Sequence, residues 1–181
     1  MRQRKVFIGI QLPASVRKKL VQKIEKWQDL PIKWIREDSF HITLSFIGYV
    51  SDESIIDICR NISQAVAKVA VFDIQFGNIK LGSEKNRPNL IWLEGESSDK
   101  LKDLDEIIAK NLGIFVEKRK EFRPHVTLGR LRAKKWETLP EKPKIFEKFS
   151  VSVPVESVEI FESREENEKK KYFTLESCAL S

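Results

Sequence analysis

The tetrad His41-Ile-Thr-Leu44 returns 84 positions later as His125-Val-Thr-Leu128, and these tetrads contain both histidines of the sequence. Each tetrad alternates polar and aliphatic residues, which is the pattern of a half-buried β-strand. Residues i and i+2 of a strand face the same way, so each histidine shares a face with its threonine. The tetrads therefore predict two strands that each present an imidazole and a hydroxyl on one face and bury two aliphatic side chains on the other.

The shift of 84 residues also aligns sequence outside the tetrads. Apolar residues recur without a gap in the pairs Phe7 and Ile91, Leu20 and Leu104, Ile24 and Ile108, and Ile32 and Val116. Each half then runs as strand, helix, short strand and tetrad strand. We expect a duplicated unit, with two lobes related by a pseudo-two-fold axis within one domain over residues 1–181.

Hydrophobic periodicity predicts the remaining elements. Strands are expected at 5–12, 32–35, 40–47, 72–81, 90–94, 114–116, 123–131, 153–161 and 171–177. Helices are expected after Pro13, after Ser51 and between Ser98 and Gly113, where capping residues border apolar side chains at helical spacing. Residues 133–150 show no clear pattern. The expected fold is α+β and bilobal, with antiparallel sheet in each lobe, helices on the outside and an active-site cleft between the lobes.

Composition narrows the class of protein. With 181 residues, 41% of them hydrophobic, the chain can bury a core. Its net charge of +6 is compatible with a polyanionic partner but alone favours nucleic acid only slightly. Cys59 and Cys178 are too few for a disulfide framework, and no stretch reaches the ~20 apolar residues of a membrane span. We expect a cytoplasmic monomer without a membrane partner.

Two imidazoles and two hydroxyls on one pocket suit an in-line displacement at phosphorus. One neutral histidine takes a proton from water, and the other, as imidazolium, donates one to the departing ribose oxygen. Thr43 and Thr127 donate hydrogen bonds to the non-bridging oxygens. A strained cyclic phosphate needs no metal for this step, and neither tetrad has a carboxylate to complete a metal site, so no cofactor is expected. Symmetry leaves the roles of His41 and His125 interchangeable.

A single histidine in an apolar strand is ordinarily a structural residue. The catalytic interpretation depends on finding both histidines in the same tetrad, at equivalent places of the repeat. The basic clusters, Lys169-Lys170-Lys171 among them, are mostly solvated faces, of which one or two can line the cleft and hold a polyanionic backbone. Trp34 and Trp92 can stack on bases, although buried packing is their simpler use.

The residues around the tetrads resemble a known family. Phe40-His-Ile-Thr-Leu-Ser-Phe-Ile-Gly48 and Arg123-Pro-His-Val-Thr-Leu-Gly-Arg130 resemble the paired HxTx motifs of the two-histidine phosphoesterase superfamily. The opening Arg4-Lys-Val-Phe-Ile-Gly-Ile-Gln-Leu-Pro13 and the chain length resemble the RNA 2′,3′-cyclic phosphodiesterases, also called 2′-5′ RNA ligases. The resemblance runs from about residue 4 to the C-terminus. It is specific at the two motifs and loose between them.

This resemblance implies an activity and roles for the histidines. The activity is hydrolysis of a terminal RNA 2′,3′-cyclic phosphate to a 2′-phosphate, with reversible 2′-5′ ligation of RNA halves as a second activity. RNA with cyclic-phosphate ends, tRNA halves included, is the implied partner. By position, His41 matches the family's proton donor to the leaving 3′-oxygen, and His125 matches the proton acceptor that activates water.

Phe46 and Arg130 each lie five residues after a motif histidine. The resemblance suggests that Phe46 contacts a base and Arg130 the phosphate. Side chains alternate between the two faces of a strand, so a residue five positions after a histidine should lie on the face opposite to it. A bulge at Gly129, or the end of the strand at Gly48, would reverse this expectation.

Two other functions fit the same motifs. A non-catalytic RNA-binding module would retain the cleft and bind RNA in a salt-dependent manner without turnover. A phosphodiesterase for another cyclic phosphate, derived from a nucleotide or from ADP-ribose, would share the chemistry at phosphorus, because loops select the substrate.

Overall fold

A computed structural model describes residues 3–84, 87–113, 122–166 and 169–181. Along the chain its helices and strands are β1 (Gln3–Gln11), α1 (Ala14–Ile24), β2 (Ile32–Trp34), β3 (His41–Ser51), α2 (Asp52–Val66), β4 (Phe72–Glu84), β5 (Arg87–Gly95), α3 (Asp99–Asn111), β6 (His125–Leu131), α4 (Ala133–Glu137), β7 (Phe146–Val155), β8 (Ser157–Glu166) and β9 (Lys169–Ala179). The strand expected at 114–116, and with it Val116, lies outside the described residues.

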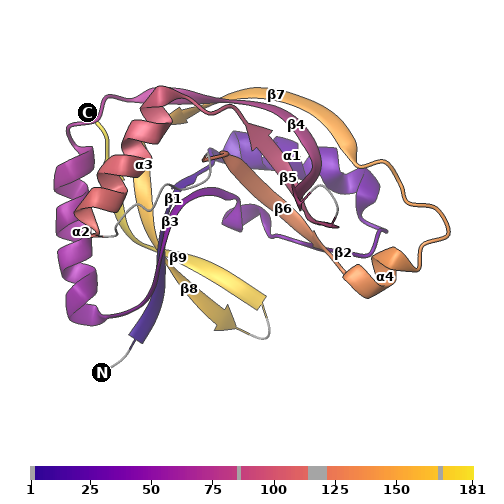
Figure 1. Cartoon of the computed structure of the whole chain (residues 1–181), viewed down its shortest axis with the longest axis horizontal. Coiled ribbons are helices and arrows are strands. Elements are labelled where there is room, and N and C mark those ends of the chain that lie inside the picture. Colours follow the sequence, from indigo (N-terminus) through magenta and orange to yellow (C-terminus); the bar gives the residue numbers. More distant parts are fainter. Residues whose placement is uncertain (1–2, 85–86, 114–121, 167–168) are drawn as a thin grey trace.

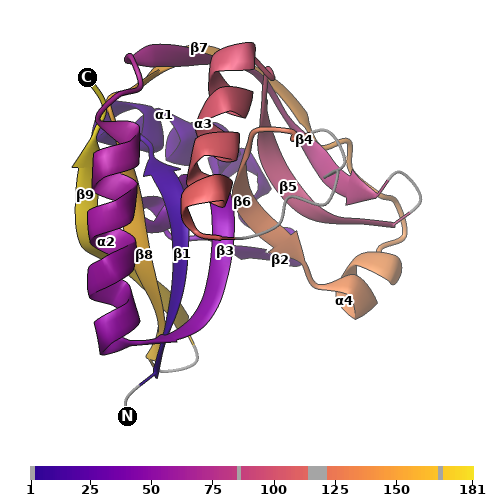
Figure 2. The same cartoon turned by 60° about the vertical axis from the view of Figure 1, so that its left-hand side comes forward.

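The described strands form one antiparallel sheet whose order is symmetrical about its centre. The order is β7-β4-β5-β6-β3-β1-β8-β9, with β2 paired to β6 off this path. Two sets of four strands therefore meet where β3 and β6 pair, through Ile42 and Val126. Helices α2 and α3 lie side by side on the outside of the sheet (Figures 1 and 2). The expected bilobal α+β fold is confirmed, with its two lobes joined in one sheet.

Local signals for the helix ends are also confirmed. Ser51 caps α2, since its hydroxyl accepts a hydrogen bond from the Ser54 amide at 3.2 Å. Ser98 caps α3 in the same way, and Gly113, with φ of 67°, follows the last turn of that helix. Aliphatic and aromatic side chains from both halves of the sheet form one core cluster. No helix in the described part of the chain is long and apolar enough to cross a membrane.

The C-terminal region differs from the expected elements. The prediction of a single strand over residues 153–161 is wrong, because β7 ends at Val155 and β8 begins at Ser157. The apolar run continues across this break because β8 is buried on both faces, as Val158, Ile160 and Phe161 show. The unassigned residues 133–150 contain α4 and the start of β7.

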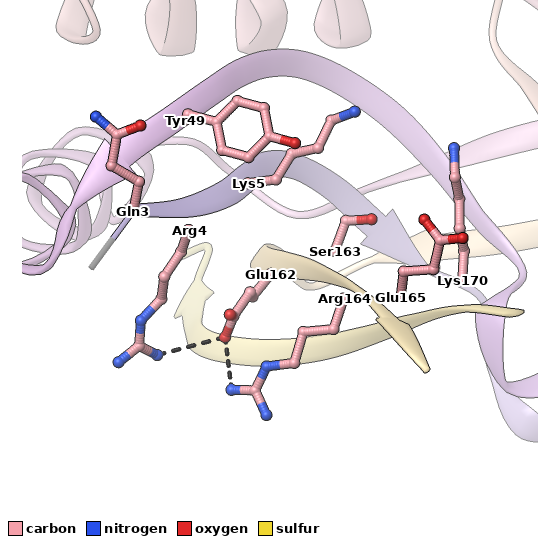
Figure 3. Close-up of a pocket in the computed structure, with 9 residues that line it drawn as sticks. All are labelled: Gln3, Arg4, Lys5, Tyr49, Glu162, Ser163, Arg164, Glu165 and Lys170. Carbon is pink, nitrogen blue, oxygen red and sulfur yellow. Dashed lines mark hydrogen bonds and ion pairs between the residues drawn. The ribbon is translucent and has the colours of Figure 1, made fainter. Parts of the chain in front are cut away.

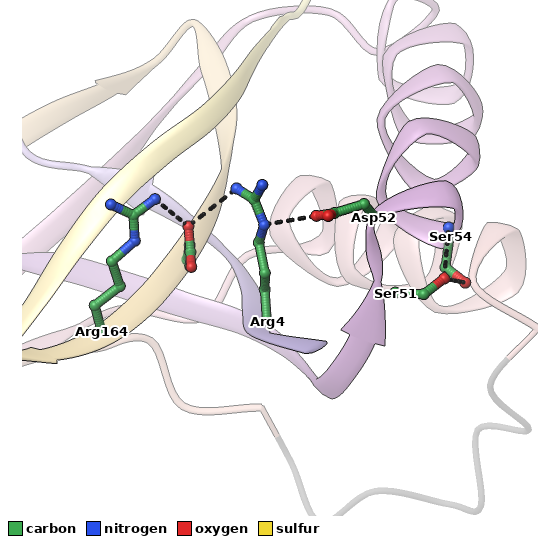
Figure 4. Close-up of polar contacts among 6 residues, drawn as sticks. Arg4, Ser51, Asp52, Ser54 and Arg164 are labelled. Carbon is green, nitrogen blue, oxygen red and sulfur yellow. Dashed lines mark hydrogen bonds and ion pairs between the residues drawn. The ribbon is translucent and has the colours of Figure 1, made fainter. Parts of the chain in front are cut away.

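A buried carboxylate connects β1, β8 and α2. Glu162 is 3% exposed and accepts hydrogen bonds from Arg4 at 3.3 Å and from Arg164 at 2.6 Å (Figure 3). Arg4 also lies 2.7 Å from the carboxylate of Asp52, in the first turn of α2 (Figure 4). The hydrogen bond from Arg164 lowers the pKa of Glu162, against the opposing effect of burial.

Replacing Glu162 by glutamine should lower the thermal unfolding midpoint by a few degrees at neutral pH, because two guanidinium groups lose their shared counter-charge. A carboxyl whose pKa is lowered by folding stabilises the protein above its unfolded pKa of ~4.3, and this contribution is lost as the pH falls through the folded value. The difference between wild type and Glu162→Gln should therefore narrow in calorimetric scans below about pH 4. The exposed neighbour Glu165, changed to glutamine, is the control. An equal effect in that control, or a difference that does not vary with pH, would contradict the prediction.

Candidate active site

The two tetrads lie where the halves of the sheet meet. Ile42 and Val126 are paired and fully buried, so the polar residues that flank them lie on the opposite face of the sheet. Because β3 and β6 are antiparallel, this register places each histidine beside the threonine of the other tetrad, His41 beside Thr127 and His125 beside Thr43. The strand register thus brings the four predicted polar residues together.

Both imidazoles are oriented by the same type of hydrogen bond. Nδ1 of His41 lies 2.7 Å from the carbonyl oxygen of Ser39, and Nδ1 of His125 lies 2.9 Å from that of Arg123. A carbonyl only accepts, so in each case Nδ1–H donates and Nε2 is left for proton transfer. Nε2 of His41 lies 3.0 Å from Oγ1 of Thr43, whose hydroxyl donates to the neutral ring. The two carbonyls are themselves one repeat apart in the sequence.

Aromatic side chains enclose His41. Its ring centroid lies 4.9 Å from that of Phe7, 5.1 Å from Tyr172 and 5.8 Å from Phe161. Burial lowers the pKa of His41, the Ser39 carbonyl raises it, and the positive charge of His125 lowers it. The free site therefore favours neutral His41.

One large aromatic ring supports His125. The indole of Trp92 lies 4.3 Å from the imidazole, centroid to centroid. Trp92 fits there because Gly82 has no side chain: a Cβ at Gly82 would lie 2.0 Å from the indole. Trp92 therefore contacts the second imidazole much as Phe7 contacts the first, which agrees with the packing interpretation of this tryptophan.

Register shifts at equivalent positions change the face of the residues that follow each tetrad. β3 shifts against β1 at Leu44, and β6 shifts against β5 at Leu128. Each shift reverses strand parity, so Phe46 and Arg130 lie on the same face as the histidines. Phe46 is 73% exposed, and its ring lies 6.1 Å from that of Phe7.

The charge of Arg130, in one half of the sheet, influences Tyr172, in the other half. Burial raises the pKa of Tyr172, and the positive charge of Arg130 opposes this rise. The charge of Arg130, on β6, thus acts on the ring that contacts His41. Alternation along the strand alone, which places Phe46 and Arg130 on the face opposite to the histidines, therefore gives the wrong prediction for both residues. Of the two exceptions considered, the bulge lies at Leu128, one residue before Gly129, and β3 does not end at Gly48 but continues to Ser51.

Sequence reasoning missed most of the aromatic residues around His41. Phe7 carried a weak signal, because the repeat aligns it with Ile91, next to Trp92. Tyr172 and Phe161 belong to the β8–β9 hairpin, which follows the stretches that the sequence repeat aligns. No feature of the repeat could have assigned them to the site.

The symmetrical antiparallel sheet, with an HxTx tetrad in each half, defines a two-histidine phosphoesterase. A profile of the 2′-5′ RNA ligase superfamily matches residues 13–167. The chain belongs to this superfamily.

Relatives and solved structures agree with this family. An RNA 2′,3′-cyclic phosphodiesterase of Thermotoga maritima is 30% identical over 144 residues, and one of Aquifex aeolicus is 28% identical over 143; each alignment covers 76% of both chains. A crystal structure from Thermus thermophilus matches with a TM-score of 0.81 at 21% identity, over 97% of both chains. E. coli LigT complexed with NADP+ matches with a TM-score of 0.76 at 20% identity, over 99% of both chains. At these identities the two structures show the shared fold.

Proposed function

We propose that this protein is an RNA 2′,3′-cyclic phosphodiesterase, which hydrolyses the terminal cyclic phosphate of RNA to a 2′-phosphate. The observation that supports it best is the pairing of Ile42 with Val126, which places the two histidines and the two threonines of the tetrads at neighbouring positions on one face of the sheet. The Thermotoga and Aquifex relatives carry this activity in their names. We also propose reversible 2′-5′ ligation of RNA ends, tRNA halves included; the superfamily to which the chain belongs supports the ligation.

The mechanism is an in-line displacement at phosphorus. Water attacks the phosphorus atom, one histidine accepts the water proton at Nε2, and the bond from phosphorus to the 3′-oxygen breaks. The other histidine, protonated at Nε2, donates its proton to that oxygen, which leaves a 2′-phosphate monoester. The hydroxyls of Thr43 and Thr127 and the guanidinium of Arg130 stabilise the charge on the non-bridging oxygens. Phe46, exposed on the same face, contacts the terminal base.

The family resemblance makes His41 the donor and His125 the acceptor. A donor must be protonated, whereas burial lowers the pKa of His41 in the free site. The anionic cyclic phosphate reconciles these facts, because a nearby negative charge stabilises imidazolium and raises its pKa. His41 therefore gains its proton with the substrate bound.

The residues at the site offer little to a metal ion. Within the described segments, no three histidine, cysteine or carboxylate side chains gather into a possible metal site. We propose that catalysis needs no cofactor and that the protein acts as a monomer. Cys59 and Cys178 are free thiols, in keeping with a cytoplasmic location.

We further propose that residues 1–181 form one domain that arose by internal duplication. Its support is the recurrence of three features at the same offset: the tetrad itself, the carbonyl that orients its histidine and the register shift that follows it. The symmetrical strand order adds to this support.

Incubation with a short RNA that ends in a 2′,3′-cyclic phosphate should give a 2′-phosphate, observed by phosphorus NMR. EDTA should leave the rate unchanged, because the proton transfers and the charge stabilisation come from side chains. Salt-dependent binding without turnover would instead indicate an RNA-binding module. Loss of the rate on chelation would indicate a metal enzyme. Turnover of a cyclic phosphate derived from ADP-ribose, in preference to RNA, would change the substrate class.

A further inference from the structure

Beyond the aromatic rings around His41, the histidine face of the sheet continues into a polar pocket at the ends of β1, β3 and β8. Lys5 pairs with Tyr49 on one side and with Ser163 on the other. Lys5 lies two residues from Phe7 along β1, so both side chains face the same way. Lys170 completes this side of a pocket of about 270 Å³, here called the strand-end pocket (Figure 3).

A second register shift brings Tyr49 onto this face. Between the pairs Phe7–Phe46 and Val6–Gly48, β3 gains one residue relative to β1. As a result, β3 presents four polar or aromatic side chains in order along the histidine face: His41, Thr43, Phe46 and Tyr49. Tyr49 is 68% exposed, so its ring is accessible as a stacking surface.

The charges of the strand-end pocket suit an anion. Its lining carries four cationic and two carboxylate side chains, namely Arg4, Lys5, Arg164 and Lys170 with Glu162 and Glu165. Arg4, Glu162 and Arg164 alternate with Lys5, Ser163 and Glu165 along β1 and β8, so they lie on the opposite face of the sheet, where Glu162 is bonded to both arginines. The remaining charged residues of the lining are Lys5, Lys170 and Glu165, and their charges sum to one net positive charge. The ammonium of Lys5 lies 5.9 Å from the centroid of the Tyr49 ring, so a cation and an aromatic face are presented together.

We propose that the strand-end pocket binds the nucleotide that precedes the cyclic-phosphate end of the RNA, a proposal that rests on the function proposed above. Tyr49 stacks on its base, and Lys5 and Lys170 pair with its phosphate. Gly9 lies against His41, and the four residues from Gly9 to Lys5 span ~13 Å of strand. The pocket is therefore displaced from the reacting phosphate along the strand direction, on the same face, as a subsite for a neighbouring nucleotide requires.

Comparison of two substrates tests this subsite. The variants Lys5→Gln, Tyr49→Ala and Lys170→Gln, singly and combined, are assayed with a nucleoside 2′,3′-cyclic phosphate and with a trinucleotide that ends in one. The combined variant should lose about tenfold or more in kcat/KM for the trinucleotide and nothing for the mononucleoside, which does not reach the pocket. Lys68→Gln, an exposed change outside the pocket, is the matched control and should affect neither substrate.

Each outcome has a distinct meaning. Equal losses on both substrates, or no loss on either, overturn the subsite. Loss confined to the ligation of a second RNA strand also overturns it, because that strand would then be the occupant. If the wild type turns over neither substrate, the proposed phosphodiesterase activity is rejected, and the subsite is then tested separately.

That separate test measures the binding of an uncyclised hexanucleotide. The combined variant must bind it more weakly, and the slope of log affinity against log salt concentration must fall by about 0.7 for each lost phosphate contact. Unchanged binding rejects the proposal.

Discussion

Replacing either histidine, in the variants His41→Ala and His125→Ala, should lower kcat for a nucleoside 2′,3′-cyclic phosphate by about 10²- to 10⁴-fold. Each substitution removes one of two proton transfers, and both histidine side chains are only partly buried. The thermal unfolding midpoint should therefore stay near that of the wild type. Because the two groups act in one step, the double variant should cost little more than either single variant. Full activity in one of the single variants would exclude the mechanism.

The pH dependence of the residual activity assigns the roles. If His41 donates, His41→Ala should lose the fall in rate at alkaline pH and keep the fall at acidic pH, where the base becomes protonated. His125→Ala should show the reverse. The opposite pair of profiles would exchange the roles, and a bell-shaped profile in both variants would remove the histidines from the titration.

Replacing each threonine by valine keeps the shape of the side chain and removes the hydroxyl. Thr127→Val should lower kcat by about 10²- to 10³-fold, as expected for the loss of one hydrogen-bond donor to the transition state. Thr43→Val should cost more, because Thr43 also bonds to Nε2 of His41 at 3.0 Å. Initial rates over a range of substrate concentrations separate this effect on kcat from an effect on KM.

The matched controls are Thr43→Ser and Thr127→Ser, which retain a hydroxyl. Both serine variants should recover most of the activity that the valine variants lose. If serine and valine variants are equally inactive, the threonines contribute packing rather than a hydrogen bond. If the serine and valine variants are both fully active, the threonines contribute neither packing nor a hydrogen bond to catalysis.

The sequence predicted the centre of the site better than its periphery. A strand of period two fixes which residues share a face, so the four polar residues of the tetrads followed from spacing alone. The face of Phe46 and Arg130 did not, because a one-residue register shift at Leu44 or Leu128 depends on how a strand pairs with its neighbour. The repeat made two matching halves predictable, whereas β2 joining β6 of the other half is a tertiary contact.

Residues that approach the site from distant sequence were the hardest to predict. Tyr172 contacts His41 from near the other end of the chain, and it follows the stretches that the sequence repeat aligns. The break between β7 and β8 was missed because burial on both faces of β8 erases the alternation on which the prediction depended.

The pairing of Ile42 with Val126 has a mechanical consequence. The two halves of the sheet join between the histidines. We therefore consider a small rotation of one half of the sheet relative to the other about this pair. Such a rotation would displace the outer strands farther than the residues next to Ile42 and Val126. The spacing of His41 and His125, which flank this pair, should therefore change less than the spacing of the outer strands.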